Sequence, residues 1–402
     1  MASSRKLLSI ILIASLLFCN ILYLNASAVG TSYPGASAVL AQGNSAHNLF
    51  LQRDGTVWAW GDNERGQLGD GTTINRSTPV QVKDPSDPTG YIQNVVQVSI
   101  GSEYSLALKK DGSVWTWGAY NFGTDTLALK KPIQIKAPED PTGNLSQIVY
   151  IASESTHALA LRKDGTLWGI GSDYNAVQGF YRNSNTAARD AYKVPNLANV
   201  LSVATTDDFS AVLKSDGSVW AFGDLRGVGE LHGSSEIIKQ VKDAEDSTKY
   251  LTGVVKMFGS GNCIAFVKNN GIVKILTSRD SNWTSLTAED KITVRKLNFF
   301  PAEKGILDDA VSMSFSSGFK NCLVCRKDGS VWVWSDQVKE AADITPTNLK
   351  KVPGIQGAIE VKAEVGHCMA LTKDGTIYTW GSNFAGQLGD GTLINKDTPV
   401  AV

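Results

Sequence analysis

The sequence lacks the short motifs that mark the common enzyme classes. It has no G-x-S-x-G nucleophile elbow, no H-E-x-x-H zinc helix, no P-loop and no G-x-G-x-x-G dinucleotide loop. Histidine occurs only 4 times in 402 residues, which leaves few general bases or metal ligands. We therefore predict a protein that is not an enzyme and that needs no cofactor or metal.

An excess of charge is also missing. The chain carries 38 basic and 39 acidic residues, a net charge of -1, and Lys and Arg never form a run longer than a pair. A nucleic-acid-binding surface needs concentrated positive charge to replace phosphate counterions. Nucleic acid is therefore not an expected partner.

The N-terminus has the three parts of a secretory signal peptide. Arg5 and Lys6 precede an apolar run over residues 7–24, and Ala26-Ser27-Ala28 offers a small-x-small cleavage pattern. We predict a signal peptide over residues 1–28 and a secreted, extracellular or cell-envelope protein. The alternative is an uncleaved anchor, which would be the chain's only membrane contact.

A short motif returns seven times along the chain. Each copy places a glycine after an aspartate, or after an asparagine in the fifth copy, between two apolar runs. The pairs are Asp54 and Gly55, Asp111 and Gly112, Asp164 and Gly165, Asp216 and Gly217, Asn270 and Gly271, Asp328 and Gly329, and Asp374 and Gly375. Such pairs predict a two-residue β-hairpin turn at each site, with a structural role.

Aromatic residues spaced two apart follow most of these turns, as in Trp58/Trp60 and Trp115/Trp117. Of the 10 tryptophans, only Trp283 lies outside the repeat positions. Residues two apart in a strand share one face, so these rings are expected to be packing units.

Two more strands complete each repeat. A β-branched run precedes the hairpin, as in residues 94–101, and a short strand led by proline follows it, as in residues 79–82. Four strands in roughly 50 residues, repeated seven times, predict an all-β fold, a seven-bladed β-propeller of four-stranded antiparallel blades. The similar first and last copies, residues 54–72 and 374–392, would then lie side by side and close the ring.

The predicted organisation is the leader followed by a single propeller over residues 36–402. The expected blades cover, approximately, residues 36–83, 93–136, 146–195, 198–242, 253–298, 308–353 and 358–402. We expect a monomer, because a closed ring leaves no sheet edge for pairing with another chain.

Residues 45–72 and 365–392 carry most of the string G-x-x-H-x-x-A-L-x-x-D-G-x-V-W-x-W-G-x-N-x-x-G-Q-L-G. This string resembles the repeat of the regulator of chromosome condensation (RCC1-like) superfamily, and the resemblance covers about residues 36–402. The superfamily takes its name from an intracellular guanine-nucleotide exchange factor that also binds chromatin. With its predicted export and slightly acidic charge, the chain is more similar to the exported bacterial branch of the superfamily. That resemblance implies protein binding through one face of the propeller.

The copies depart from the repeat in two ways. The fifth, residues 269–278, lacks both aromatic positions and the closing glycine. The Gly-Gln-Leu-Gly stretch occurs only in the first and last copies, at residues 66–69 and 386–389. The remaining loops are individually tailored.

Three histidines occupy one position of the repeat, eight residues before the turn glycine. We interpret them as packing residues that are each hydrogen-bonded near a strand start, because the three copies that carry them are not all adjacent, as a zinc site would require. Family resemblance places this position near the central tunnel, so a second interpretation is a partner-binding rim on one face. The candidate rim residues are His47, Glu103, Tyr104, His157, Asp207, Asp208, Phe209, Lys320, Asn321 and His367.

Four cysteines remain after the predicted leader. Cys322 and Cys325 lie three apart on a predicted strand, so their thiols face opposite sides and are not a metal or redox pair. The preferred interpretation is that all four cysteines are small buried hydrophobic residues. A disulfide between Cys322 and Cys368 in adjacent blades is the alternative, because export would permit it.

Three functions stay open, in decreasing order of preference. The first is a secreted or surface propeller that binds another protein through loops on one face. The second is an extracellular propeller enzyme or lectin acting on a polysaccharide, which as an enzyme would need two acids converging at the tunnel. The third is an intracellular exchange factor, which requires that the N-terminus not be an export signal.

Overall fold

The fold is given by a computed structural model. It describes residues 39–42, 46–84, 86–119, 128–171, 190–207, 209–223, 238–243, 249–261, 263–269, 273–277, 293–296, 310–316, 321–335, 349–364 and 366–402. Within these ranges, no helix is long and apolar enough to cross a membrane. The predicted leader, residues 1–28, and the fifth turn, Asn270 and Gly271, lie outside the described residues.

The described residues form seven β-sheets, and six of them have four antiparallel strands in consecutive chain order. The first sheet contains β1 (Val39–Gln42), β2 (His47–Leu51), β3 (Val57–Gly61) and β4 (Arg76–Gln81). The second contains β5 (Val95–Ile100), β6 (Tyr104–Lys109), β7 (Val114–Ala119) and β8 (Ala128–Gln134). The third contains β9 (Ile148–Glu154), β10 (His157–Arg162), β11 (Leu167–Gly171) and β12 (Tyr192–Lys193).

The remaining three sheets of this form follow the same plan. The fourth contains β13 (Val200–Thr205), β14 (Phe209–Lys214), β15 (Val219–Gly223) and β16 (Lys239–Gln240). The sixth contains β22 (Ala310–Phe315), β23 (Asn321–Arg326), β24 (Val331–Ser335) and β25 (Leu349–Lys351). The seventh contains β26 (Ala358–Ala363), β27 (His367–Thr372), β28 (Ile377–Gly381) and β29 (Lys396–Ala401). An all-β propeller with four-stranded antiparallel blades is therefore confirmed.

The fifth sheet departs from the prediction of seven like blades. It contains five strands, β17 (Lys242–Asp243), β18 (Val254–Ser260), β19 (Cys263–Lys268), β20 (Val273–Thr277) and β21 (Thr293–Lys296). The short β17 pairs with β21 in parallel, whereas the other strands pair antiparallel. In the part of the chain that the structure describes, six blades therefore have the predicted form.

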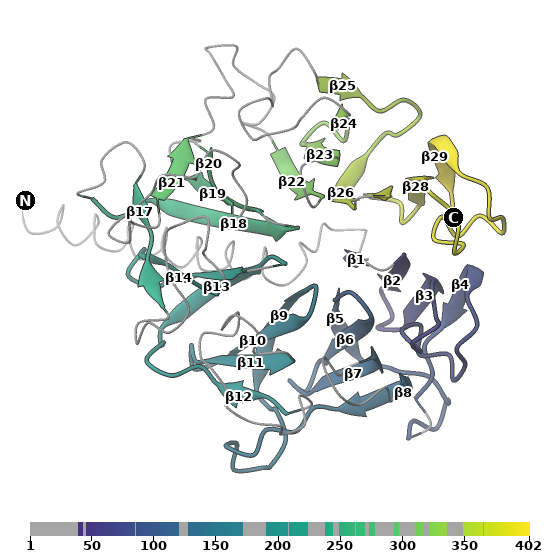
Figure 1. Cartoon of the computed structure of the whole chain (residues 1–402). Coiled ribbons are helices and arrows are strands. Elements are labelled where there is room, and N and C mark those ends of the chain that lie inside the picture. The colour runs from purple at the N-terminus through teal and green to yellow at the C-terminus, as the bar shows by residue number, and fades with distance from the viewer. Residues whose placement is uncertain are drawn as a thin grey trace, which may run out of the picture.

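The sheets surround a common centre, with one innermost strand each (Figure 1). These strands are β1, β5, β9, β13, β18, β22 and β26, and each contacts the next around the ring. β26 also contacts β1, so the first and last sheets are neighbours although most of the chain separates them. Because each of these two sheets is built from one continuous segment, side-chain and loop contacts hold them together.

The hairpin turns have three loop residues, so the prediction of two-residue turns is wrong. In the first sheet, the Gln52 N–H donates to the Thr56 carbonyl (2.9 Å) and the Gly55 N–H donates to the Gln52 carbonyl (3.0 Å). Gly55 has a φ of 82°, the left-handed conformation that closes a three-residue loop. Asp54 Oδ1 accepts bonds from the Thr56 N–H and hydroxyl, which lower the pKa of Asp54.

Four of the described turn glycines, Gly55, Gly112, Gly165 and Gly329, also join their sheet to the next one. The Gly55 carbonyl accepts a bond from the Val95 N–H (3.1 Å), at the start of β5. The same bond links Gly112 to Ile148 and Gly165 to Val200. At these four glycines the turn motif therefore forms the hairpin and the inter-sheet contact together.

The outer strands begin earlier than predicted. β4 starts at Arg76, so Pro79 lies inside the strand and does not lead it. It sits at a register irregularity, because Gly61 pairs with Arg76 and Ala59 pairs with Val80. A proline is tolerated at such a point because no ladder donor is required there.

The core lies between sheets. One cluster joins Leu106 of the second sheet to Ile151 of the third, and another joins Leu51 of the first sheet to Val98 of the second. Trp60 and Trp117, the second aromatic of each pair, are fully buried. The rings are therefore the predicted packing units, and they stabilise the ring by joining neighbours.

Candidate functional site

The predicted rim residues are mostly interior, which corrects their interpretation as an exposed binding surface. His47, Tyr104, His157, Phe209 and His367 each begin the second strand of a sheet, and the most exposed of them, His367, is only 3% accessible. The second strand is covered by neighbouring sheets, so this position serves inter-sheet packing.

The other rim candidates have different surroundings. Glu103 is accessible and its Oε1 lies 3.8 Å from Arg65 Nε. Asp207 is half-buried, and its N–H donates to the Gly261 carbonyl of the fifth sheet. Asp208 and Lys320 lie outside the described residues, and Asn321 begins β23.

Each histidine bonds to the following sheet. His47 Nε2 lies 3.1 Å from Ser105 Oγ, His157 Nε2 lies 2.9 Å from Ser210 Oγ, and His367 Nε2 lies 3.1 Å from Asn48 Oδ1. An amide oxygen only accepts, so His367 donates from Nε2. Burial lowers the pKa of His157 and of His367 to about 3, which keeps both rings neutral. The interpretation as hydrogen-bonded packing histidines is confirmed for these three.

The Gly-Gln-Leu-Gly loops complete these contacts at two seams. The Gln67 carbonyl accepts bonds from Ser105 Oγ (2.8 Å) and from the indole N–H of Trp117 (2.8 Å) in the next sheet. Because the Ser105 hydroxyl has one hydrogen, Ser105 accepts from His47. We call this set of four residues, His47, Gln67, Ser105 and Trp117, a latch.

The same latch closes the ring between the last and first sheets. The Gln387 carbonyl accepts bonds from the Asn48 amide (2.8 Å) and from the Trp60 indole N–H (3.1 Å), and His367 donates to Asn48. The first and last copies of the repeat are thus alike because each supplies the latch to the sheet that follows it.

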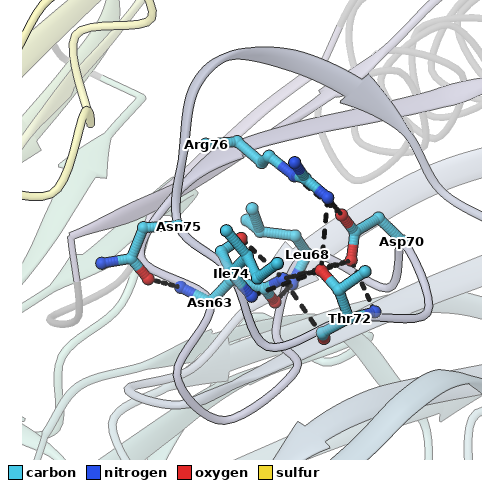
Figure 2. Close-up of polar contacts among 7 residues, drawn as sticks. All are labelled: Asn63, Leu68, Asp70, Thr72, Ile74, Asn75 and Arg76. Atoms are coloured by element: carbon cyan, nitrogen blue, oxygen red, sulfur yellow. Dashed lines mark hydrogen bonds and ion pairs between the residues drawn. The ribbon is translucent and has the colours of Figure 1, made fainter.

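A buried asparagine organises each of these loops, and Figure 2 shows Asn63 in the first. Asn63 Oδ1 accepts from the Leu68 N–H, while Asn63 Nδ2 donates to Asp70 Oδ1 and to the Thr72 and Ile74 carbonyls. The Asn63 N–H in turn donates to Asn75 Oδ1 (2.7 Å). This side chain therefore holds both ends of the loop over residues 63–75.

Asn383 makes the equivalent bonds in the last sheet. It accepts from Leu388 and donates to Asp390 and to the Thr392 and Ile394 carbonyls. The loop then rests on the first sheet, where the Gly391 N–H donates to the Ser77 carbonyl (2.8 Å). A methyl group on Gly386 would lie 2.6 Å from Ser77 Cα, so this close approach requires glycine.

These rigid loops expose large apolar side chains at their tips. Ile74 is 60% accessible in the first sheet, and Phe384, Leu393 and Ile394 are 74%, 63% and 65% accessible in the last. Sequence reasoning missed these residues, because a scattered apolar residue in a repeat is normally assigned to the core. The signal lies in the difference between the first and last copies of the loop when they are compared position by position.

Two buried acids bear on the alternative enzyme hypothesis. Glu154 ends the innermost strand β9 and Glu364 directly follows the innermost strand β26, and each is only 6% accessible. Burial raises the pKa of Glu154 well above its ordinary value, and the charges of Glu364 and Asp207 raise it further. Glu154 Oε1 has no hydrogen-bond partner. In the described ranges, no three potential metal ligands cluster.

The four described cysteines are buried and form no disulfide, so the predicted alternative of a disulfide between Cys322 and Cys368 is wrong in this structure. Burial raises the pKa of the Cys368 thiol to about 12 and raises that of Cys322 further. Such thiols pack as small hydrophobic residues and are poor nucleophiles, as the preferred interpretation expected.

Antiparallel four-stranded blades around a centre, latched by a repeated motif, define a repeat β-propeller. The Regulator of chromosome condensation (RCC1) repeat matches residues 54–108 and 374–402, and a second form of that repeat matches residues 95–123. Over these residues the chain is similar to the RCC1 repeat.

Proteins that are similar in sequence to this chain have diverse roles. The chain is 22% identical to the ultraviolet-B receptor UVR8 of Arabidopsis thaliana, over 91% of this chain and 82% of that protein. It is 22% identical to the guanine nucleotide exchange factor SRM1 of Saccharomyces cerevisiae, over 85% and 80%. It is 28% identical to the human probable E3 ubiquitin-protein ligase HERC6, over 71% of this chain but only 28% of that protein.

Solved structures share the fold. Human WBSCR16 superposes with a TM-score of 0.65 at 18% identity, covering 86% of this chain and 93% of that one. Prp20p from Saccharomyces cerevisiae gives a TM-score of 0.51 at 18% identity, covering 90% and 76%. At this identity the likeness concerns the fold alone.

Proposed function

We propose that this chain is a secreted or cell-surface propeller that binds another protein through the loops of one face. We further propose a seven-bladed ring of the exported bacterial type, in which the irregular fifth sheet takes the place of one blade. The leader-like N-terminus over residues 1–28 supports export.

One observation carries the binding proposal. The loops at residues 63–75 and 383–395 are each held by a buried asparagine and fixed to the next sheet, yet they expose large side chains. A rigid scaffold with exposed anchors loses little conformational entropy on binding, which favours a protein interface. The RCC1-like relatives include receptors and regulators, and this supports binding over catalysis.

The test is capture followed by mapping. The full chain would be immobilised and exposed to culture fluid and envelope extract of the producing organism, and bound material would be cross-linked and identified by mass spectrometry. We expect a stoichiometric protein with cross-links to the loop face. Retention by cell-wall polysaccharide without any protein would contradict the proposal.

The buried acids keep a second candidate open, an enzyme or lectin acting on a polysaccharide. Glu154 and Glu364 interact electrostatically at the ends of two innermost strands, and a raised pKa is what a general acid requires. Glu154→Gln would abolish polysaccharide hydrolysis if this candidate were correct and leave protein binding intact if it were not. An intracellular exchange factor is the third candidate, and sequencing the N-terminus of the chain from its native source would discriminate it, because cleavage after Ala28 excludes it.

A further inference from the structure

The loops of the first and last sheets share one scaffold but differ at their tips. Aligned on the asparagines, Glu64 corresponds to Phe384 and Thr73 corresponds to Leu393. The internal bonds are the same, as described above for Asn63 and Asn383. The scaffold therefore accepts polar residues at both positions, and folding does not account for Phe384 and Leu393.

The exposed apolar side chains of the last loop belong to one hydrogen-bonded unit. Phe384 follows Asn383, whose amide nitrogen lies 3.0 Å from the Thr392 carbonyl and 3.2 Å from the Ile394 carbonyl, on either side of Leu393. Three large side chains thus project from one hydrogen-bonded unit. The loop also abuts Ser77 of the first sheet, three residues after the exposed Ile74. We call Phe384, Leu393 and Ile394 the apolar tip.

Two cations beside these loops are paired with acids of their own loop, and Asp397, next to Lys396, is exposed. Arg76 Nη2 lies 2.7 Å from Asp70 Oδ2 beside Ile74, and Lys396 Nζ lies 3.7 Å from Asp390 Oδ2 beside Ile394. Both carboxylates are nearly buried within their own loops. Neither cation is therefore available to attract a phosphate group or an anionic membrane, and the exposed Asp397 carboxylate repels both, so the complementary occupant is an apolar surface without negative charge.

We infer that the apolar tip is the anchor of the protein interface and docks a partner segment that presents apolar side chains without compensating charge. This inference rests on the proposed function and names the contact point and the chemistry of the partner. An exposed aromatic ring flanked by aliphatic side chains, with a polar rim, has the anatomy of an interface hot spot.

The chain supplies its own test variant. Phe384→Glu combined with Leu393→Thr copies the tip of the first loop onto the last, where the same scaffold already tolerates those residues. We expect an unchanged melting temperature, because both positions are exposed. Tyr250→Ser, which removes a 46% accessible aromatic ring elsewhere, is the matched control for general stickiness.

The probe is a phage-displayed random peptide library, panned on the wild-type full chain with the tip variant as soluble competitor. We expect enriched peptides with aromatic or aliphatic anchors, bound at least tenfold more weakly by the tip variant and equally by Tyr250→Ser. Failure to enrich peptides that discriminate the two proteins would overturn the inference.

Two further measurements test other occupants. If wild type dimerises in sedimentation equilibrium and the tip variant does not, the occupant is a second copy and the inference is wrong. If the tip variant loses binding to uncharged phosphatidylcholine vesicles, the occupant is a membrane and the inference is again wrong. If a captured protein partner binds the tip variant as tightly as wild type, the proposed function stands while this inference fails.

Discussion

At the scale of single residues, one position of the repeat holds histidine in three sheets and an aromatic residue in two others. Where it is histidine, the neighbouring sheet offers a hydroxyl or an amide, as Ser210 does for His157. Where it is aromatic, the neighbour is apolar, and Tyr104 shares a cluster with Ala158. The residue at this position and the residue that faces it in the neighbouring sheet are therefore chemically matched. A buried polar group needs a hydrogen-bond partner, whereas an apolar one does not.

This matching predicts a compensating pair. His157→Phe alone should lower the free energy of unfolding by about 1–3 kcal/mol, since Ser210 Oγ loses its imidazole partner in a buried seam. Adding Ser210→Ala reproduces the chemistry of the seam between Tyr104 and Ala158, and should recover part of that loss. Urea unfolding of both single variants and the double variant measures the coupling. Purely additive effects would show that the pair is not matched.

The buried acid predicts a pH dependence of stability. The pKa of Glu154 is raised above its ordinary 4.5, so the folded state keeps its proton while the unfolded state releases it as pH rises. Stability is therefore fully present below pH 4.5 and falls as pH increases, by about 1.4 kcal/mol per pH unit until the folded pKa is reached. Glu154→Gln should unfold at a higher temperature than wild type at neutral pH, with no difference at pH 4. A gap that widens towards acid would contradict this.

At the scale of the element, the hairpin turn owes its sequence to two demands, a left-handed glycine and a close neighbour. Gly329 and Gly375 hold equivalent turns, with φ of 78° and 92°. A methyl group on Gly329 would lie 2.5 Å from Gly357 Cα, whereas one on Gly375 would meet no described atom within 4 Å. The same substitution therefore separates backbone strain from the inter-sheet contact.

Gly375→Ala should cost about 1 kcal/mol, the strain of a left-handed alanine. Gly329→Ala should cost roughly 1–3 kcal/mol more, because the backbone of the neighbouring strand must also move. Thermal unfolding of the two variants, compared with wild type, measures the difference. Equal losses would mean that the turn glycine is required for its conformation alone.

Sequence reasoning predicted the elements well where the determinants were local and repeated. Strands, turns and the propeller class follow from Asp-Gly pairs and spaced tryptophans, because these patterns act within one repeat. The rim prediction failed at His47 and Phe209, because their burial depends on the adjacent sheet, which no single repeat encodes. The parallel strand β17 was missed for the same reason, as its partner β21 lies about 50 residues further along the chain.

At the scale of the whole molecule, closure of the ring depends on non-covalent seams. Without the last sheet, Asn48 and Trp60 lose the Gln387 carbonyl, and β1 and β22 lose β26 as a neighbour. Each blade buries its core against its neighbours, so removing one exposes two apolar faces. Stability is therefore a property of the closed ring, and the single blades are not independently stable.

Deletion of residues 358–402 should consequently leave no stable six-sheet protein. We expect loss of cooperative unfolding in calorimetry and strong binding of an apolar dye, because the faces of the first and sixth sheets become exposed. Co-expressing residues 358–402 as a separate chain is the control, since the latch of His367, Asn48 and Gln387 needs no covalent link between the two sheets. Recovery of a cooperative transition by the co-expressed segment would show that the missing seam was the cause. A truncated chain that unfolds cooperatively near the wild-type temperature would instead show that the ring can re-close over the gap.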